Sequence, residues 1–320
     1  MSSHFLWPKG SIIRTVFSAY RLTSISTIEE KLRCLFPSGY PVLCTSGRSA
    51  LFLALSESGV TRKDFVGVFP YASHCVLNTI ARLATPLSEP THTVPNLRVV
   101  FHQWGYRQEI LVPPNTIEDC VDTLCVPGAN LFPSGGRFEI WSLPKILGTT
   151  SGGVLWCRDE HTAKKLRKVQ LNRPSGFSHG MLRLIGRRFK KAYVYWHGAE
   201  CILGRLTKFQ LGEIVVAINK WDRFVEDREK KLNMVWPFVV DGITKPTERL
   251  PSVVPINSKL SDGEVHLMGI SSGYRMFEEF KGDGSRQLLS VLPVPIHQDV
   301  SEHWLDNFVN SGAVKTKEVR

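Results

Sequence analysis

The sequence has no apolar run of the roughly 20 residues that a membrane-spanning helix needs. Its first residues, MSSHFLWPKGSIIR, lack the long apolar core of a signal peptide. It also has no CxxC pair, and its seven cysteines are an odd number scattered along the chain. Zinc sites and disulfide frameworks are therefore not expected. These absences predict a soluble, cytoplasmic protein with reduced thiols.

Acidic residues are in short supply, because 29 Asp and Glu stand against 40 Lys and Arg, which gives a net charge of +11. Much of the excess lies in residues 164–193. A solvated basic face is the ordinary interpretation. A groove for phosphate-bearing ligands and a weak peripheral contact with an anionic membrane are the alternatives. Nucleic acid is not an expected partner, because the chain shows no recognised nucleic-acid module.

The length of 320 residues predicts one large domain and a smaller one. From residue 40 onward, strand and helix patterns alternate, which indicates a mostly parallel α/β sheet flanked by helices. Pro237 and the loop after it suggest a boundary. We therefore expect a large domain over residues 1–235, with an N-terminal arm, and a small C-terminal α+β domain over residues 236–320.

Capping residues predict where several helices begin. Ser26 or Thr27 would cap the helix IEEKLRCLF, a second helix would start near Ser46, and Asp299 or Ser301 would open the closing helix SEHWLDNFVN. The segment FQLGEIVVAINKWDRFVEDREKKLNMVW has the pattern of one long amphipathic helical stretch.

Two short stretches have the residue types of a ligand site. Ser46, Gly47 and Ser49 form a Ser-Gly-x-Ser turn at a helix start, which can offer N–H groups and hydroxyls to a phosphate. Similar caps occur in proteins that bind nothing. Asp119 falls at the predicted carboxyl end of a buried strand, where ligands sit in doubly wound sheets. Capping of the following turn is the alternative for Asp119.

Phe138 to Cys157 reads as an apolar strand, a polar turn that carries Lys145, a glycine-rich reversal and a second strand. A lysine between buried strands is costly unless its charge is removed or used, because desolvation disfavours the ammonium form. Schiff-base chemistry uses such an amine. A hairpin with an exposed lysine at its tip is the alternative.

Taken in order, several segments resemble the DegT/DnrJ/StrS family of pyridoxal-phosphate (PLP) sugar aminotransferases, which have PLP fold type I. The similarity runs from about Tyr40 to Phe308. The segments that carry it are TSGRSALFLAL, FPYASHCVLNTIARLATP, FHQWGYRQEI, TIEDCVDTL, SLPKILGTTSGG and LPVPIHQDVSEHWLDNF.

The resemblance implies a role for each matching residue. Lys145 matches the lysine that condenses with the cofactor aldehyde and then moves a proton, and Asp119 matches the aspartate that keeps the pyridine nitrogen protonated. His74, or else Tyr71, would stack on the cofactor ring, and an ordinary buried histidine is the alternative for His74. The residues matched to the phosphate site are Gly47, Arg48, Ser49 and Ser142.

The sequence also departs from the family pattern. Asp122 replaces the family's His or Gln near the cofactor, so a second negative charge should raise one carboxyl pKa unless Arg48 or another cation compensates. Many members of the family have an Asn two residues before an Arg that reaches the cofactor phosphate of the partner subunit. This chain keeps the Arg, as Arg205, but has Leu203 in place of the Asn. The chain is also shorter than expected, apparently in the small domain.

The resemblance implies a homodimeric PLP-dependent aminotransferase with active sites at the subunit interface. Its substrate would be a nucleotide-linked keto sugar and its amine donor an amino acid, with glutamate expected, in surface polysaccharide or specialised sugar biosynthesis. The alternative is a catalytically degenerate binding or scaffold protein that keeps the fold.

Overall fold

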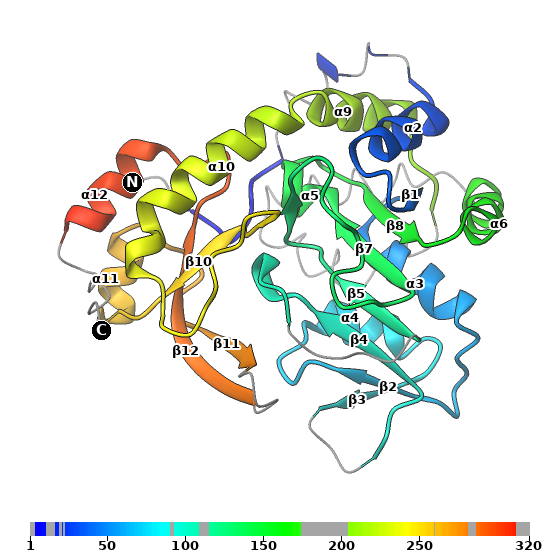
Figure 1. The fold of residues 1–320 in the computed structure, drawn as a ribbon, viewed down its shortest axis with the longest axis horizontal. Helices are drawn as coiled ribbons and strands as arrows, with labels where there is room; N and C mark the ends of the chain where they lie inside the picture. The colour runs from blue at the N-terminus through cyan, green and yellow to red at the C-terminus, as the bar shows by residue number, and fades with distance from the viewer. Residues whose placement is uncertain are drawn as a thin grey trace, which may run out of the picture.

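A computed structural model describes residues 4–10, 17–18, 21, 23–89, 93–108, 115–173, 204–258, 260–280 and 286–311. Its main feature is a seven-stranded sheet in the order β1-β8-β7-β5-β4-β2-β3 (Figure 1). The pairs from β7 through β5, β4 and β2 to β3 are parallel, whereas β8 runs antiparallel to both β7 and β1. The carboxyl ends of β5 and β7 therefore meet at one edge of the sheet.

The strands of this sheet are β1 (Tyr40–Cys44), β2 (Phe65–Val68), β3 (Thr85–Ser88), β4 (Leu97–Phe101), β5 (Thr116–Asp119), β7 (Phe138–Ser142) and β8 (Gly153–Cys157). The accompanying helices are α2 (Ile25–Leu35), α3 (Gly47–Glu57), α4 (His74–Ile80), η1 (Gln103–Gly105), α5 (Leu143–Leu147), α6 (Glu160–Leu171), α9 (Lys208–Ile218) and α10 (Trp221–Val235).

The C-terminal part adds a three-stranded antiparallel sheet in the order β10-β12-β11. Its elements are η2 (Trp236–Phe238), β9 (Arg249–Leu250), β10 (Val253–Ile256), α11 (Asp262–Leu267), β11 (Arg275–Phe280), β12 (Arg286–Pro295) and α12 (Glu302–Asn310). The short strand β9 pairs with β6 (Leu124–Cys125), so the two parts of the chain are joined by a small sheet. The domain boundary at residue 235 stays a prediction.

The predicted helix starts are partly right. Ser46 caps α3 through its hydroxyl, which accepts from the Ser49 amide, and Ser301 caps α12, as expected. The cap of α2 is Ser24, and the prediction of Ser26 or Thr27 was wrong. Ser24 Oγ accepts from the Thr27 amide at 3.1 Å and also binds both expected hydroxyls, so the helix begins earlier.

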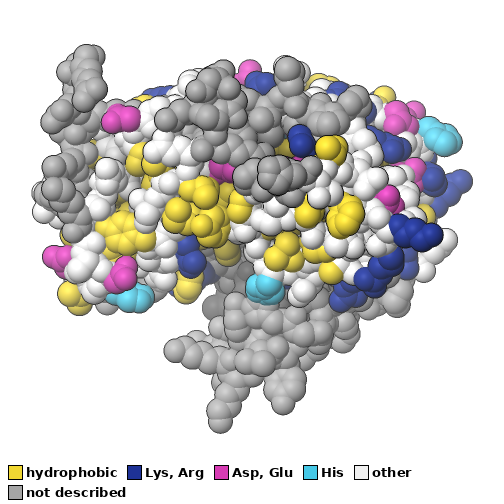
Figure 2. All heavy atoms as spheres, turned by 90° about the horizontal axis from the view of Figure 1, so that it is seen from below, with side chains coloured by type: hydrophobic (Ala, Val, Ile, Leu, Met, Phe, Trp, Pro, Cys, Tyr) yellow, Lys and Arg dark blue, Asp and Glu magenta, His cyan; other side chains and the backbone are white. Residues whose placement is uncertain are grey.

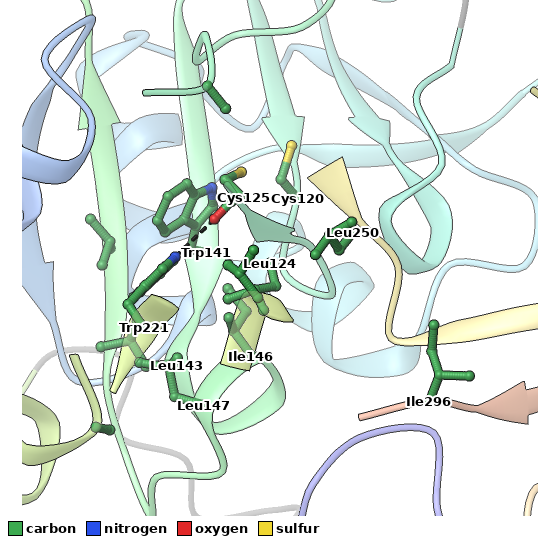
Figure 3. Packing of buried hydrophobic residues seen from close by; sticks show 14 of the residues in the cluster. Cys120, Leu124, Cys125, Trp141, Leu143, Ile146, Leu147, Trp221, Leu250 and Ile296 are labelled. Atoms are coloured by element: carbon green, nitrogen blue, oxygen red, sulfur yellow. Dashed lines mark hydrogen bonds between the residues drawn. The ribbon is translucent and has the colours of Figure 1, made fainter. Parts of the chain in front are cut away.

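The long amphipathic segment is two helices rather than one. α9 ends at Ile218, and α10 begins at Trp221 after Asn219 and Lys220. The indole of Trp221 is buried and donates to the Cys125 carbonyl at 2.8 Å, which is the dashed line in Figure 3. The break therefore lets α10 start with a large side chain fixed in the core.

The lysine segment forms the expected antiparallel hairpin of β7 and β8, but Lys145 lies on a short helix and not in a polar turn. Pro144 fits the first turn of α5, where no amide donor is needed. Gly148 ends the helix with φ +70°, a left-handed conformation that glycine adopts without strain. These residues were start and stop signals for a helix.

One large hydrophobic cluster lies beneath this hairpin. Leu143, Ile146 and Leu147 of α5 are fully buried and belong to the same hydrophobic cluster as Trp141, Trp221 and Ile296, which Figure 3 shows in part. The same cluster includes residues of α2, α9, α10 and the C-terminal sheet. Because three of its five side chains are held in this way, α5 presents Lys145 on its remaining face.

None of the helices in the described part of the chain has the length and apolarity that crossing a membrane requires. The described cysteines are free thiols, four of them buried. Of the basic stretch 164–193, residues 174–193 lie outside the described residues. Residues 164–171 belong to α6, where Lys164 and Lys165 form ion pairs with Glu160 and Glu57.

Candidate active site at the ends of β5 and β7

Lys145 and Asp122 form the centre of the site. Lys145 Nζ lies 3.0 Å from Asp122 Oδ1, which is the distance of an ion pair. The Asp122 carboxylate is buried, whereas the Lys145 side chain keeps 28% of its exposure. Asp122 therefore does lie next to the lysine, as its place in the sequence implies.

The charges around Lys145 act in opposite directions. Burial tends to lower its pKa, but the carboxylates of Asp122 and Asp119, together with Cys75, outweigh burial and raise it. For Asp119, burial is the main cause that raises the pKa, to about 7, with Asp122 adding to the rise and Lys145 opposing it. The three groups form one electrostatic cluster at the end of the sheet.

Asp119 is the last residue of β5 and is almost fully buried. Its Oδ1 accepts from the Val121 amide at 3.3 Å, so the capping interaction weighed from the sequence is present and does not remove the residue from the cluster. The neighbouring Glu118 points elsewhere. It binds His102 Nε2 at 2.9 Å and the amides of Ser134 and Gly136, which makes it a structural residue.

The start of α3 packs directly against this cluster. A Cβ on Gly47 would lie 3.1 Å from Val121 Cγ1 and 3.3 Å from Ser142 Cβ, so glycine allows the close approach. Ser142 ends β7 and precedes α5, three residues before Lys145. The helix start and the lysine hairpin thus meet, as the sequence prediction requires.

Ser49 supplies a hydroxyl at this helix start. Its side chain is fully buried, and Oγ has no hydrogen-bond partner among the described residues. A buried hydroxyl without a partner is costly, and such groups mark places where a ligand or water binds. Together with the amides of the first turn of α3, it is suited to an anion.

Arg48 lies beside Ser49 and is half-buried, and burial lowers its pKa while the Cys75 thiol opposes the change. Cys75, in the segment expected to supply a ring-stacking aromatic, also raises the pKa of Lys145. His74 is the exposed first residue of α4, and Tyr71 is 56% exposed. Arg205 is exposed, and Leu203 lies outside the described residues.

Sequence reasoning missed Trp7. The ring centroid of Trp7 lies 4.6 Å from Lys145 Nζ, within cation–π distance. The N-terminal arm is held there because the Lys9 amide donates to Asp299 at 2.7 Å and His297 Nε2 contacts the Phe5 carbonyl at 2.9 Å. No local motif marks Trp7, because its partner Lys145 lies far from it in the sequence. Arg228 was missed as well, although it lies near the hairpin.

Comparison with known proteins agrees with the geometry. A family model described as "Putative PLP-dependent aminotransferase" matches residues 28–313. No curated protein matches the chain.

Several solved structures have the same fold. A DegT DnrJ EryC1 StrS aminotransferase from Brucella abortus shares 14% identity at a TM-score of 0.61, over 93% of this chain and 94% of its own. The sugar aminotransferase CalS13 from Micromonospora echinospora shares 17% at 0.61, over 96% and 99%. The PLP form of "Putative sugar aminotransferase Spr1654" from Streptococcus pneumoniae shares 12% at 0.64, over 96% and 97%. The predicted fold class, PLP fold type I, is thereby confirmed.

Proposed function

We propose a substrate class for this chain, which belongs to a family of PLP-dependent aminotransferases: it transfers an amino group from an amino acid, glutamate, to a keto sugar linked to a nucleotide. The sugar part of the proposal is supported by the solved structures of similar fold, several of which are described as sugar aminotransferases. The net charge of +11 favours a substrate that carries a negatively charged diphosphate. Such an activity belongs to polysaccharide or specialised sugar biosynthesis in the cytoplasm.

The residues of the site fit pyridoxal phosphate. The unpartnered hydroxyl of Ser49 and the first-turn amides of α3, with Ser142 and Arg48 beside them, are suited to the phosphate. The buried carboxylate of Asp119 can hold a proton on a ring nitrogen. When bound, the cofactor supplies an aldehyde for the amine and an electron-accepting ring.

The chain's own residues would divide the work as follows. Lys145 presents the amine that binds the cofactor and, when released, moves a proton at the donor carbon. Asp122 holds that amine in place at 3.0 Å, and the Trp7 ring covers it. The observation that carries this assignment is the arrangement of Lys145, Asp119, Asp122 and Ser142 around the start of α3.

We expect a homodimer with active sites at the subunit interface. Large apolar side chains are exposed, among them Phe65, Tyr71 and Phe209. Figure 2 shows hydrophobic side chains gathered in the middle of one face, with Lys and Arg clustered toward the side that carries α3 and α6. Exposed apolar patches mark interaction surfaces. Light scattering at several concentrations tests the dimer, and a monomer at all of them would contradict it.

Weak binding of residues 164–193 to anionic membranes stays a proposal.

The absorbance spectrum of the PLP-loaded protein tests the function. We expect a visible band that Lys145→Ala abolishes and that glutamate bleaches, whereas Lys164→Ala, an exposed lysine on α6, leaves both unchanged. A band that glutamate does not alter would favour the degenerate binding protein. Restoration of the band by nucleotide-linked keto sugars, compared with the same keto sugars without the nucleotide, then tests the substrate class.

A further inference from the structure

Arg228 lies in the middle of α10 and is fully buried, although it belongs to no expected motif. Its Nη2 donates to the Ile146 carbonyl at 3.2 Å and to Gln298 Oε1 at 3.3 Å. Gln298 Nε2 donates to the same carbonyl at 3.3 Å. The carbonyl of Ile146, the residue after Lys145, is therefore held by two side chains from distant parts of the chain.

These hydrogen bonds replace partners that α5 cannot supply. A helix leaves its last carbonyls without intrahelical donors, and α5 has only five residues before it ends at Gly148. The Ile146 side chain is fixed in the core, where Figure 3 shows it beside Leu143 and Leu147. Arg228 and Gln298 hold the backbone of the same residue, because both donate to its carbonyl.

Hydrogen bonds alone do not account for a buried guanidinium. Its Nε and Nη1 have no partner among the described residues, and within them no carboxylate lies at ion-pair distance from Arg228. The adjacent Asp227 pairs with Lys231 at 2.7 Å. A buried charge without a counter-charge is strongly destabilising, so a carboxylate near Arg228 must act through its field.

Two carboxylates, Asp227 first and Asp122 second, act on Arg228 in this way. Burial lowers the pKa of Arg228 to about 10, while Asp227 and Asp122 oppose the change, so Arg228 is a cation at neutral pH. His297 also faces Arg228, but burial lowers its pKa to about 3 and it is neutral. Asp122 thus interacts with two cations, with Lys145 as an ion pair at 3.0 Å and with Arg228 at longer range, and Asp119 and Cys75 also act on Lys145.

We propose that Arg228 is a positioning residue for Lys145. Arg228 fixes the Ile146 carbonyl and offsets the negative charge of Asp122. The Lys145 ammonium group therefore loses its proton more readily than it would if it were paired with Asp122 alone. The proposal rests on the proposed function, because it takes Lys145 as the amine that binds the cofactor. It also assigns a compensating cation to Asp122, the role that the sequence suggested for Arg48 or another cation.

The pH dependence of Lys145 labelling by an amine-reactive reagent, measured by peptide mass spectrometry on cofactor-free protein, tests the charge effect. Arg228→Met should raise the labelling midpoint by about one pH unit, because a nearby cation disfavours the ammonium form. Arg228→Lys should stay nearer the wild type. Gln298→Met removes a donor to the same carbonyl without changing charge, so its midpoint should not move. An unmoved midpoint in Arg228→Met, or an equal shift in Gln298→Met, overturns the proposal.

Thermal unfolding of the cofactor-free protein provides a second test if Arg228→Met does not fold alone. Asp122→Asn should lower the melting temperature, because two cations lose their shared carboxylate, and adding Arg228→Met should recover part of the loss. Simple additivity, or a double variant less stable than Asp122→Asn, overturns the proposal. Both measurements omit the cofactor, so failure of PLP binding or of transamination leaves them interpretable.

Discussion

Trp7 and Lys145 are in contact, although one lies in the N-terminal arm and the other in the hairpin of β7 and β8: the ring centroid is 4.6 Å from Nζ. The arm also packs on the same hairpin at Pro8, whose Cβ lies 3.1 Å from where a Cβ on Gly148 would stand. The amine is therefore bounded by a carboxylate on one side and by an aromatic ring on another.

We expect Trp7→Ala to expose the Lys145 amine and to destabilise its ammonium form by about 1 kcal/mol, the size of a partly desolvated cation–π contact. Labelling of Lys145 by an amine-reactive reagent at fixed pH should become several-fold faster, and Trp7→Phe should lie between. Phe5→Ala is the matched control, because Phe5 makes a similar contact with Lys9 in the same arm. Equal labelling in all three variants would contradict the assignment.

The pKa of Asp119 gives a pH dependence of stability. Burial raises this pKa from 3.8 to about 7, so the folded, cofactor-free protein holds a proton that the unfolded chain releases between those values. Stability contributed by this group is thus present at pH 4 and lost as the pH rises to 7. Asp119→Asn should remove the loss and exceed the wild type at pH 8 by on the order of 2 kcal/mol.

Urea unfolding of the cofactor-free protein at pH 4, 5.5, 7 and 8 measures this effect. Glu160→Gln serves as the control, since its carboxylate is half exposed on α6. If the difference in unfolding free energy between Asp119→Asn and wild type does not grow from pH 4 to 7, Asp119 is not buried as a titrating group.

Much of the fold and of the site could be predicted from the sequence because the signals are local. The cap at Ser46, the glycine that follows it, and Asp119 at the end of a buried strand depend on neighbours in the chain, and all lie where expected. The helix α5 could also have been predicted, because Pro144 and Gly148 are start and stop signals for a helix. Trp7 and Arg228 could not be predicted in this way, because each reaches Lys145 across the fold and no spacing rule connects them to it.

Gly153 tests the packing of β8 on the start of α3. A Cβ there would lie 2.2 Å from the Ser46 carbonyl carbon, a backbone atom that cannot move without shifting the helix start. Gly153→Ala should therefore lower the unfolding free energy by about 3 kcal/mol or more. Gly263→Ala, with open space around it on α11, should be neutral or slightly stabilising. Denaturant unfolding compares the two, and similar effects would refute the close approach.

Substitution of Ser49 should have opposite effects on the stability of the cofactor-free protein and on its affinity for PLP. Its buried hydroxyl has no partner among the described residues, so Ser49→Ala removes an unsatisfied polar group and should slightly stabilise the cofactor-free protein. If that hydroxyl binds the cofactor phosphate, the same change should weaken PLP binding by about tenfold, the value of one hydrogen bond to a charged group. Ser56→Ala is the control, because Ser56 binds the Phe52 carbonyl on the outer face of α3. Melting temperatures without cofactor and equilibrium titration with PLP measure both effects. A variant that loses stability without cofactor and keeps wild-type PLP affinity would show that Ser49 serves the core and not the phosphate.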